Sequence, residues 1–566
     1  MDAIKRTPRE LTETRWGSLK LERSSWVGQW QELSRFVQPR AGRFAVSDRN
    51  KGGRKDQSIY DNTATRSLRV LAAGLMSGMT SPARPWFRLT TPDPDLAKNA
   101  EVKVWLAAVT QKILDVFQAS NTYLTLHSAY EELGLFGTSA SVVMDDFDRV
   151  LWHHHTPVGE FALASDFKGT IDTVYREFQK PVGEIVKEFG YNQCSQAVKN
   201  LYDRGTLDAW VTLVHAIQPR SDRDLSRRDN KNKAWASLYF EQGGDKNTFL
   251  REGGYDEFPA LCARWAKQGG DIYGASPGME ALGDTKQLQH QQLRKANAID
   301  YMTKPPLQVP SSMKNSEVDM LPGGLTFVDT TGAGNTVKSL FDVNLRLDYL
   351  LEDMRDVRQR IQQSYYSDLF LMLANDSTGQ MTATEVAERH EEKMLVLGPV
   401  LERLHNELLE PLVDMAFSKL LLAGALPPPP EALQGVTLDV QFVSVLAQAQ
   451  RAIGVNGIDR FVGNIGMVAQ FNPGVLDKFD ADKWADVYSD SLGIDPSLII
   501  ANDKVALIRD ARAKAAAQAQ KVAMAEQAAS AAQKLGSVST QGGQSNAAVD
   551  MMNQFSGYGS PSGVEV

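Results

Sequence analysis

The stretch FDVNLRLDYLLEDMRDVRQRIQQSYY, residues 341–366, decides how the middle of this chain is built. Most positions between its apolar residues carry Arg, Asp, Glu or Gln. The apolar residues recur at steps of three and four, and they are Val343, Leu347, Leu350, Met354, Val357, Ile361 and Tyr365. Such spacing places one apolar stripe along an α-helix. The sequence therefore predicts a long, strongly amphipathic helix here.

A second long helix is predicted upstream, over residues 278–303, GMEALGDTKQLQHQQLRKANAIDYMT. It is unusually polar, and its thin apolar stripe consists of Leu282, Leu288, Leu293, Ala296 and Ile299. The Lys-Pro-Pro of residues 304–306 ends it, because proline cannot continue a helix and disfavours the helical conformation of the residue before it. Residues 304–340, between the two helices, are rich in Pro and Gly and contain strand-like fragments.

Together these segments predict a helix–insert–helix hairpin, and two interpretations of it remain open. Neither helix is apolar enough all round to be buried inside a monomer. In a ring, each hairpin would bury one stripe on the adjacent subunit and leave a polar face lining a channel. Alternatively, the hairpin is a helical arm packed on its own domain.

Outside the hairpin, the pattern predicts a mainly α fold with small antiparallel β-sheets, an α+β class. Helices are expected over residues 8–38, over 61–77 with Asp61 or Thr63 as N-cap, and over 99–134 with an interruption near Asn121. From Ser139 onward, short apolar runs broken by turns predict antiparallel strands, with a helix at 181–188 and a second strand-rich region at 206–265.

The C-terminal part is again largely helical in prediction. Residues 373–380 form a polar loop, and a helix from Thr382 or Thr384 runs to about Leu422 with bends at Pro399 and Pro411. Residues 427–430 are four prolines, and residues 436–445 alternate like a strand. An Ala- and Gln-rich helix is expected over 500–535. The Gly-, Ser- and Asn-rich tail from Gly536 is expected to be disordered.

The composition narrows the class of function. The 566 residues include 61 basic and 69 acidic side chains, a formal net charge of −8, and 2 cysteines. Two cysteines cannot build a disulfide framework or a Cys-rich zinc site, which fits a reducing compartment. The longest largely apolar run, residues 70–83, is too short to span a membrane, and no signal peptide is predicted. Without a basic excess, any contact with DNA must be local or weak.

Two motifs resemble catalytic or ligand-binding sites and are better explained as structure. Residues 332–339, GAGNTVKS, have Val337 where a phosphate loop needs glycine, which favours an ordinary loop. The run of histidines at 153–155 would place His153 and His155 on one face of a strand, close to Asp145, Asp146 and Asp148. No ligand spacing supports a metal site, so a solvated turn and a polar strand are favoured. No catalytic, cofactor-binding or metal-binding residue is predicted.

Five stretches of the chain form an ordered set that is informative as a whole. These are RSLRVLAAGLMSGMTSPARPWFRL (67–90), HSAYEELGLFGTSASVVMDD (127–146), PVGEFALASDFKGTIDTVYREFQKPVGEIVKEFG (157–190), ALGD (281–284) and MTATEVAERHEEKMLVLGPVLERLHNELLEPL (381–412). In these stretches the sequence resembles the portal, or head-to-tail connector, proteins of short-tailed double-stranded DNA bacteriophages. No single motif carries the resemblance, which covers roughly residues 10–510.

The resemblance implies a phage portal fold assembled as a ring, usually of twelve copies, at one capsid vertex. DNA would enter through the ring during packaging and leave through it during ejection. The implied regions are a wing (1–277), two stem helices (278–303 and 341–366), a clip (304–340), a tunnel-loop region (367–383), a wing and crown base (384–499), a crown helix (500–535) and a tail (536–566).

The resemblance also implies the partners and the location. The expected partners are the major capsid protein, a scaffolding protein, the terminase and tail adaptor proteins, with double-stranded DNA passing through the channel. The protein would be a component of the virion that assembles in the host cytoplasm, without a membrane, a cofactor or enzyme activity. Two alternatives stay open, namely a metal-dependent phage nuclease using Asp145, Asp146 and the histidines, and a non-ring head–tail adaptor or scaffold protein.

A channel for sliding DNA should hold few phosphates at once, because each neutralised phosphate adds affinity. Twelve copies at −8 would carry about −96 formal charges, which disfavours tight binding. A few basic rings could still centre the duplex. The candidate channel-lining residues are Lys286, Arg294, Arg346, Arg355 and Arg358 on the two helices, with Asn375, Asp376, Ser377, Thr378 and Gln380 in the loop.

Overall fold

The computed structural model describes residues 6–48, 52–93, 96, 99–227, 229–303, 307–308, 338–339, 347–374, 397–433, 435–443, 461–492 and 502–536. Several predictions lie outside these residues, namely Arg346, the loop residues 375–380, the start of the next helix at Thr382 or Thr384, most of the 304–340 insert and the tail beyond Gly536. The chain divides into two compact units, 1–453 and 454–566.

The first unit begins with the helices that the sequence predicts. They are α1 (Pro8–Phe36), α2 (Thr63–Met79), α4 (Ala100–Ala119) and α5 (Thr122–Phe136), with the break before Thr122 where it was expected. Thr7 caps α1 in a capping box with Glu10, which satisfies two backbone amides at the helix start. The N-cap of α2 is Asn62, not Asp61 or Thr63. Asp61 instead accepts a hydrogen bond from the backbone amide of Thr63 at 2.9 Å.

Two antiparallel sheets follow, as the alternating apolar runs predict. A three-stranded sheet has the order β3-β2-β9, built from β2 (Thr138–Asp146), β3 (Val150–Thr156) and β9 (Ala260–Arg264). A five-stranded sheet has the order β4-β5-β6-β7-β8, built from β4 (Phe161–Ser165), β5 (Ile171–Pro181), β6 (Trp210–Pro219), β7 (Trp235–Glu241) and β8 (Arg251–Tyr255). The short helices α6 (Val182–Phe189) and α7 (Gln196–Asp203) lie between β5 and β6 in the chain, and α7 was not predicted.

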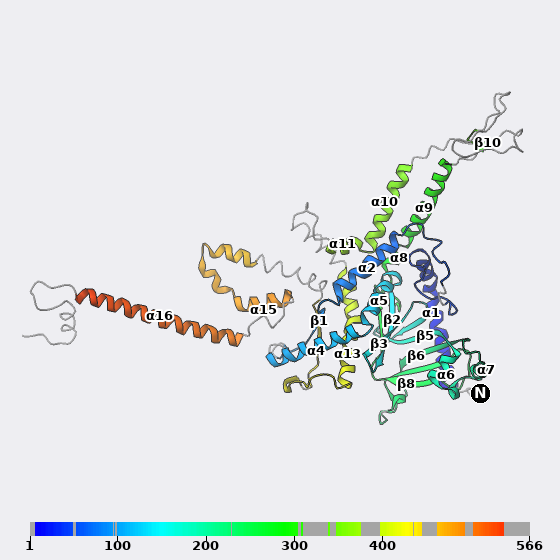
Figure 1. The fold of residues 1–566 in the computed structure, drawn as a ribbon, viewed down its shortest axis with the longest axis horizontal. Coiled ribbons are helices and arrows are strands. Elements are labelled where there is room, and N and C mark those ends of the chain that lie inside the picture. Colours follow the sequence, from blue (N-terminus) through cyan, green and yellow to red (C-terminus); the bar gives the residue numbers. More distant parts are fainter. Residues whose placement is uncertain are drawn as a thin grey trace, which may run out of the picture. The chain divides into compact units, whose positions relative to one another are not determined.

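The hairpin forms at the predicted place. Its first helix consists of α8 (Pro277–Glu280) and α9 (Leu282–Thr303), and its second is α10 (Leu347–Ser364), followed by α11 (Ser367–Ala374). Figure 1 shows α9 and α10 side by side, extending away from the sheets. In the insert, β10 (Leu307–Gln308) pairs antiparallel with β11 (Lys338–Ser339). Of the predicted range 341–366, α10 accounts for Leu347–Ser364, and residues 341–346 lie outside the described part.

The next helix is described from Leu397 onward and continues through α13 (Glu410–Leu422). A π-helical turn at His405–Leu409 joins its two parts and ends two residues before Pro411. Proline removes one backbone donor and crowds the carbonyl four residues earlier, so the wider turn accommodates it at the predicted bend. Farther on, β12 (Asp439–Phe442) pairs antiparallel with β1 (Phe87–Thr90), a long-range pairing that was not predicted.

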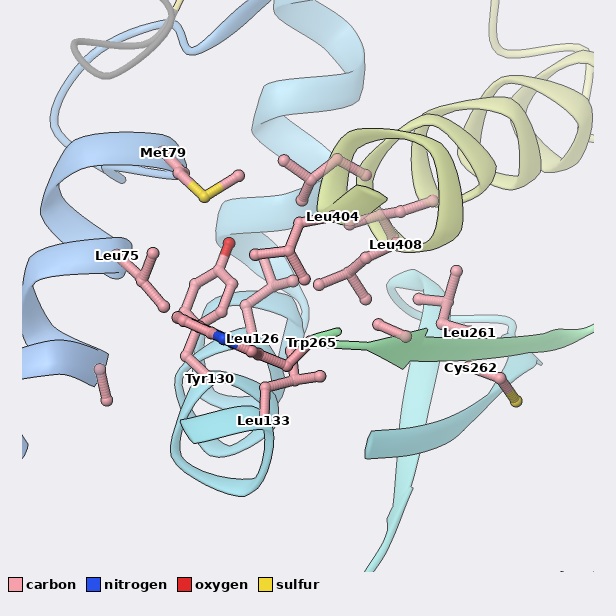
Figure 2. Close-up of a cluster of buried hydrophobic side chains, with 14 of the residues drawn as sticks. Leu75, Met79, Leu126, Tyr130, Leu133, Leu261, Cys262, Trp265, Leu404 and Leu408 are labelled. Carbon is pink, nitrogen blue, oxygen red and sulfur yellow. The ribbon is translucent and has the colours of Figure 1, made fainter. Parts of the chain in front are cut away.

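The main hydrophobic core lies where α2, α5, β9 and the helix described from Leu397 onward meet. Figure 2 shows this cluster, with side chains from all four elements pointing toward one another. Its labelled members are Leu75, Met79, Leu126, Tyr130, Leu133, Leu261, Cys262, Trp265, Leu404 and Leu408, and all are buried. Helix α2, which contacts α10 of the hairpin, is therefore part of one well-packed core.

The second unit contains a helix at 461–469, α15 (Ala481–Leu492) and α16 (Asn502–Gly536). The predicted helix at 500–535 is confirmed as α16. Arg509 of α16 holds both carboxylate oxygens of Asp482 on α15, at 2.5 and 2.7 Å. In neither unit does the described part contain a helix that is long and apolar enough to cross a membrane.

Candidate functional site

Both hairpin helices are fixed at their base to the loop that precedes α2. The side-chain oxygen of Gln289, on α9, accepts hydrogen bonds from the backbone amides of Tyr60 (2.6 Å) and Asp61 (2.8 Å). The side-chain amide of Gln289 donates to the backbone carbonyl of Asp61 at 2.7 Å. Arg358, on α10, donates from Nη2 and Nε to the Asp61 carboxylate at 2.8 and 3.1 Å. One short loop therefore binds both helices.

The electrostatics of this joint favour a charged Asp61. Burial by itself raises the pKa of the Asp61 carboxyl, but hydrogen bonds from Thr63 and Arg358 outweigh it, so the pKa lies below its usual value. Gln289 is almost fully buried, at 4% exposure. The Gln289 amide binds part-buried backbone groups of the loop at Tyr60 and Asp61, which need hydrogen-bond partners where water is partly excluded.

The described basic candidates differ in their partners. Lys286 contacts Glu32 of α1, with Nζ 2.6 Å from Oε2, and Arg358 is held by Asp61. Arg294 donates to the ring of His290 one turn earlier at 3.4 Å. Among the described residues, Arg294 and Arg355 are exposed and have no acidic partner. In the described part of the chain, Lys286 and Arg358 therefore form ion pairs with carboxylates of the same chain, whereas Arg294 and Arg355 pair with no carboxylate.

The inner half of the α10 stripe is buried within its own chain. Met354, Val357, Ile361 and Tyr365 have 0% exposure, and α10 packs on α2 and α11. For this half of the stripe, burial within its own chain corrects the interpretation that the stripe packs on an adjacent subunit. The physical reason is the return of α11, which the left-handed conformation of Tyr366 (φ 54°) permits. Phe370 of α11 then packs against Gly74 of α2, where a Cβ would lie only 2.2 Å from its ring.

The histidine and aspartate candidates do not converge. His153 bonds through Nε2 to the hydroxyl of Thr122 at 2.9 Å, whereas Nε2 of His155 lies 3.3 Å from Oε1 of Glu132. Asp145 contacts Lys419 on α13, and its side chain is 79% exposed. In the part of the chain that the structure describes, no three His, Cys, Asp or Glu side chains are arranged to hold a metal ion. Nothing in this geometry favours the nuclease interpretation.

The comparisons with known proteins now identify the family. The family described as "Bacteriophage head to tail connecting protein" matches residues 9–500. The chain belongs to this family. It is 58% identical over 552 residues, 98% of this chain and 99% of the relative, to the "Probable portal protein" of Bordetella phage BPP-1. It is 44% identical over 535 residues, 94% of this chain and 96% of the relative, to the "Portal protein" of Salmonella phage epsilon15.

Two solved structures of particles also show a distant likeness. A chain from the virion of a native gene transfer agent particle gives a TM-score of 0.34 at 12% identity, over 81% of this chain and 96% of that one. A chain from the neck of an empty gene transfer agent particle gives a TM-score of 0.32 at 11% identity, over 81% and 97%. The assignment to the head-to-tail connecting family rests on the sequence relatives, whose identity extends over nearly the whole chain.

Sequence reasoning missed the residues that join the hairpin to the rest of the chain. Gln289 and Asp61 are ordinary polar residues on exposed-looking stretches, and no motif marks either one. The only available signal was the placement of Gln289 one residue after Leu288, at the edge of the thin stripe. That position is compatible with a buried amide, but it does not name the backbone that the amide binds.

Proposed function

We propose that this chain is a portal protein, which forms a ring at one capsid vertex through which DNA enters during packaging and leaves during ejection. The ring would also be the attachment platform for the packaging motor and the tail. The observation that carries the proposal is the 58% identity, over 98% of the chain, to a protein named as a portal of a bacteriophage. The exposed hairpin supports it, because a paired set of polar helices suits the wall of an aqueous channel.

The regions of the chain take the corresponding roles in this proposal. The wing is 1–277, the stem consists of 278–303 and 341–366, and the clip is 304–340. The tunnel-loop region is 367–383, the wing and crown base is 384–499, and the crown helix is 500–535. The fixed base formed by Gln289 and Arg358 suits a stem, because a helical pair that guides DNA must keep its direction under load.

The proposed channel contacts are few and local. Among the described candidates, Arg294 and Arg355 have no acidic partner in the described residues, whereas Lys286 and Arg358 hold ion pairs. Arg346 and the loop residues Asn375, Asp376, Ser377, Thr378 and Gln380 remain proposed contacts outside the described part. With a net charge of −8 per copy, the ring as a whole would be negatively charged, which favours sliding of the duplex over tight binding.

The proposed role is structural rather than enzymatic. ATP hydrolysis would belong to the terminase, and the other partners would be the major capsid protein, the scaffolding protein and tail adaptor proteins. The protein would form a ring of twelve, assemble in the host cytoplasm and remain in the virion. The family relationship supports a virion component, and the number of copies and each partner are parts of the proposal.

Electron microscopy and native mass spectrometry of the purified chain test the ring directly. At 62.5 kDa per copy, twelve copies would weigh about 750 kDa, and images should show a closed ring with an axial hole. Monomers or open filaments at all concentrations would overturn the proposal. The variant Asp146→Ala tests the nuclease alternative, because it should leave DNA packaging intact in a portal and abolish turnover in a nuclease.

A further inference from the structure

The outer half of the hairpin exposes large apolar side chains. Leu293 of α9 is 37% exposed and Leu351 of α10 is 42% exposed, whereas Leu288 and Met354, closer to the body, are buried. Ile299 is exposed as well, at 42%. Two helices in water do not gain from leaving such side chains exposed, since removing apolar surface from water is favourable. A partner that covers this exposed surface would therefore stabilise the hairpin.

Two contacts between α9 and α10 fix how the helices face each other. Arg360 lies 3.5 Å from Asp284, and Gln291 contacts Asp353. The paired residues are seven positions apart on each helix, so they share one face on each helix and the two antiparallel helices stay level residue for residue. The face of α9 that carries Asp284 and Gln291 therefore points toward α10, and the face of α10 that carries Asp353 and Arg360 points toward α9.

This register places Leu293 and Leu351 at one level on opposite outer sides of the hairpin. Leu293 is two residues after Gln291, and Leu351 is two residues before Asp353. Two residues turn a helix by about 200°, so each leucine points away from the partner helix of its own chain. Leu293 and Leu351 of one chain therefore cannot contact each other, although they lie at the same height along the hairpin.

We propose that Leu293 of one copy packs against Leu351 of the next copy, so that α9 and α10 of neighbouring hairpins form a continuous wall. The inference rests on the proposed ring, because rotation about an axis along the hairpins keeps every residue at its own level. The outer side of α9 in one copy then meets the outer side of α10 in the next. Each copy thus uses two different surfaces, which is what a closed heterologous ring requires.

Charge complementarity supports a second copy as the occupant. In the same register, Arg294 falls between the levels of Asp348 and Glu352, and none of the three has an oppositely charged partner among the described residues. Asp348 also shares the outer face of Leu351, three residues away. Arg294 and Glu352 are both turned more than 100° from Gln289 and Arg358, which mark the side toward α2. On this arrangement Arg294 neutralises the neighbour's carboxylates, so Arg355 is left as the described candidate for contact with DNA phosphates and Arg294 is withdrawn from that role.

Cysteine cross-linking of the full-length chain tests this contact. The double variant L293C/L351C, treated with a short bismaleimide, should give a ladder of covalent multimers on a denaturing gel. A 1:1 mixture of the single variants L293C and L351C should give dimers and no larger species, because each chain then has one reactive surface. The unmodified chain is a background control, since its own Cys194 and Cys262 are buried.

The matched control is L293C/Y349C, because Tyr349 is exposed and close in level but points away from the proposed neighbour. It should give no ladder. If native mass spectrometry shows a ring and L293C/L351C still gives no ladder, the contact is overturned while the proposed function stands. If no ring forms for the unmodified chain, the proposed function itself fails.

Charge reversal gives a second readout that does not depend on cysteine chemistry. R294E and D348R should each raise the subunit concentration needed for half-assembly by about tenfold or more, because like charges then meet at every interface. A 1:1 mixture should restore assembly, since alternating copies bring opposite charges together again. Equal assembly of each single variant and the unmodified chain would overturn the charge contact. Restoration by the double variant but not by the mixture would place the pair within one chain and also overturn it.

Discussion

The carboxylate of Glu407 in the π-helical turn is held by Arg264 at the end of β9. Arg264 donates from Nη2 at 2.6 Å, from Nε at 3.1 and 3.2 Å, and from its backbone amide at 3.0 Å. The Arg264 side chain is only 3% exposed. Glu407→Gln leaves this buried guanidinium without a counter-charge, so we expect a loss of about 3 kcal/mol in the free energy of unfolding. Urea denaturation followed by tryptophan fluorescence measures it.

A substitution on the same helix provides the comparison for Glu407. Glu402 is exposed, and the Glu402→Gln variant removes the same charge without touching a buried partner. Its denaturation midpoint should stay close to that of the unmodified chain, because isolated surface charges contribute about 0 to 1 kcal/mol. If both variants shift the midpoint equally, the ion pair between Arg264 and Glu407 does not stabilise the fold as argued.

The pH dependence of stability should report the buried imidazole of His153. Burial, followed by the charges of Lys419 and His155, lowers the pKa of His153 from 6.5 to about 4. Between these two values the unfolded chain binds a proton that the folded chain does not, so stability falls as the pH falls. His153→Gln should reduce this slope by up to about 1.4 kcal/mol per pH unit between pH 6.5 and 4. Denaturation midpoints at several pH values measure it, and an unchanged slope would contradict the assignment.

The residue scale also shows what the sequence could not reveal. His153 and His155 were predicted to share one face of a strand, and strand β3 contains both of them. Their partners, Thr122 and Glu132, come from α5. A strand pattern predicts which side chains share a face, but the element that covers the face is set by tertiary packing. The buried pairs of this protein, including Arg264 with Glu407, therefore required the structure.

The attachment of the hairpin to the loop before α2 depends on one side chain of α9. Gln289→Ala removes three hydrogen bonds and leaves the backbone amides of Tyr60 and Asp61 without their partner. We expect a loss of about 1 to 3 kcal/mol in the free energy of unfolding, since each hydrogen bond contributes about 0.5 to 1.5 kcal/mol and these backbone groups are only part-buried. Hydrogen exchange should show faster exchange of these two amides. Gln287→Ala, an exposed position on the same helix, should change neither readout.

At the scale of helices and strands, the local periodicity of the sequence predicted individual elements, but no sequence pattern predicted which distant segments pair. The steps of three and four in 341–366 predicted α10, and its apolar stripe is the buried face from Met354 to Tyr365. The same pattern could not say that α2 and α11 cover the inner half, because α11 depends on the turn at Tyr366. The pairing of Phe87 with Phe442 likewise joins segments about 350 residues apart, which no local pattern encodes. Leu350, one turn farther out on the same stripe, is partly buried against the same core.

At the scale of the whole molecule, the buried core belongs to the first unit. Within the described part of the chain, no buried apolar side chain occurs after Leu433. Met1–Ile453 should therefore fold without residues 454–566, which form the second compact unit. We expect the truncated chain to keep its unfolding temperature within about 2 °C of the full chain, because removing exposed helices takes no area from the core.

Differential scanning calorimetry and circular dichroism of the truncated chain measure this prediction. Helical signal should fall by the share that α15 and α16 contribute, while the main unfolding transition stays in place. The comparison variant is Leu404→Ala in the full chain, which opens a cavity in the core of Figure 2 and should lower the stability by about 2 to 5 kcal/mol. If truncation lowers the main transition as much as Leu404→Ala does, the second unit contributes to the core of the first, and the division of the chain at Ile453 does not describe its folding.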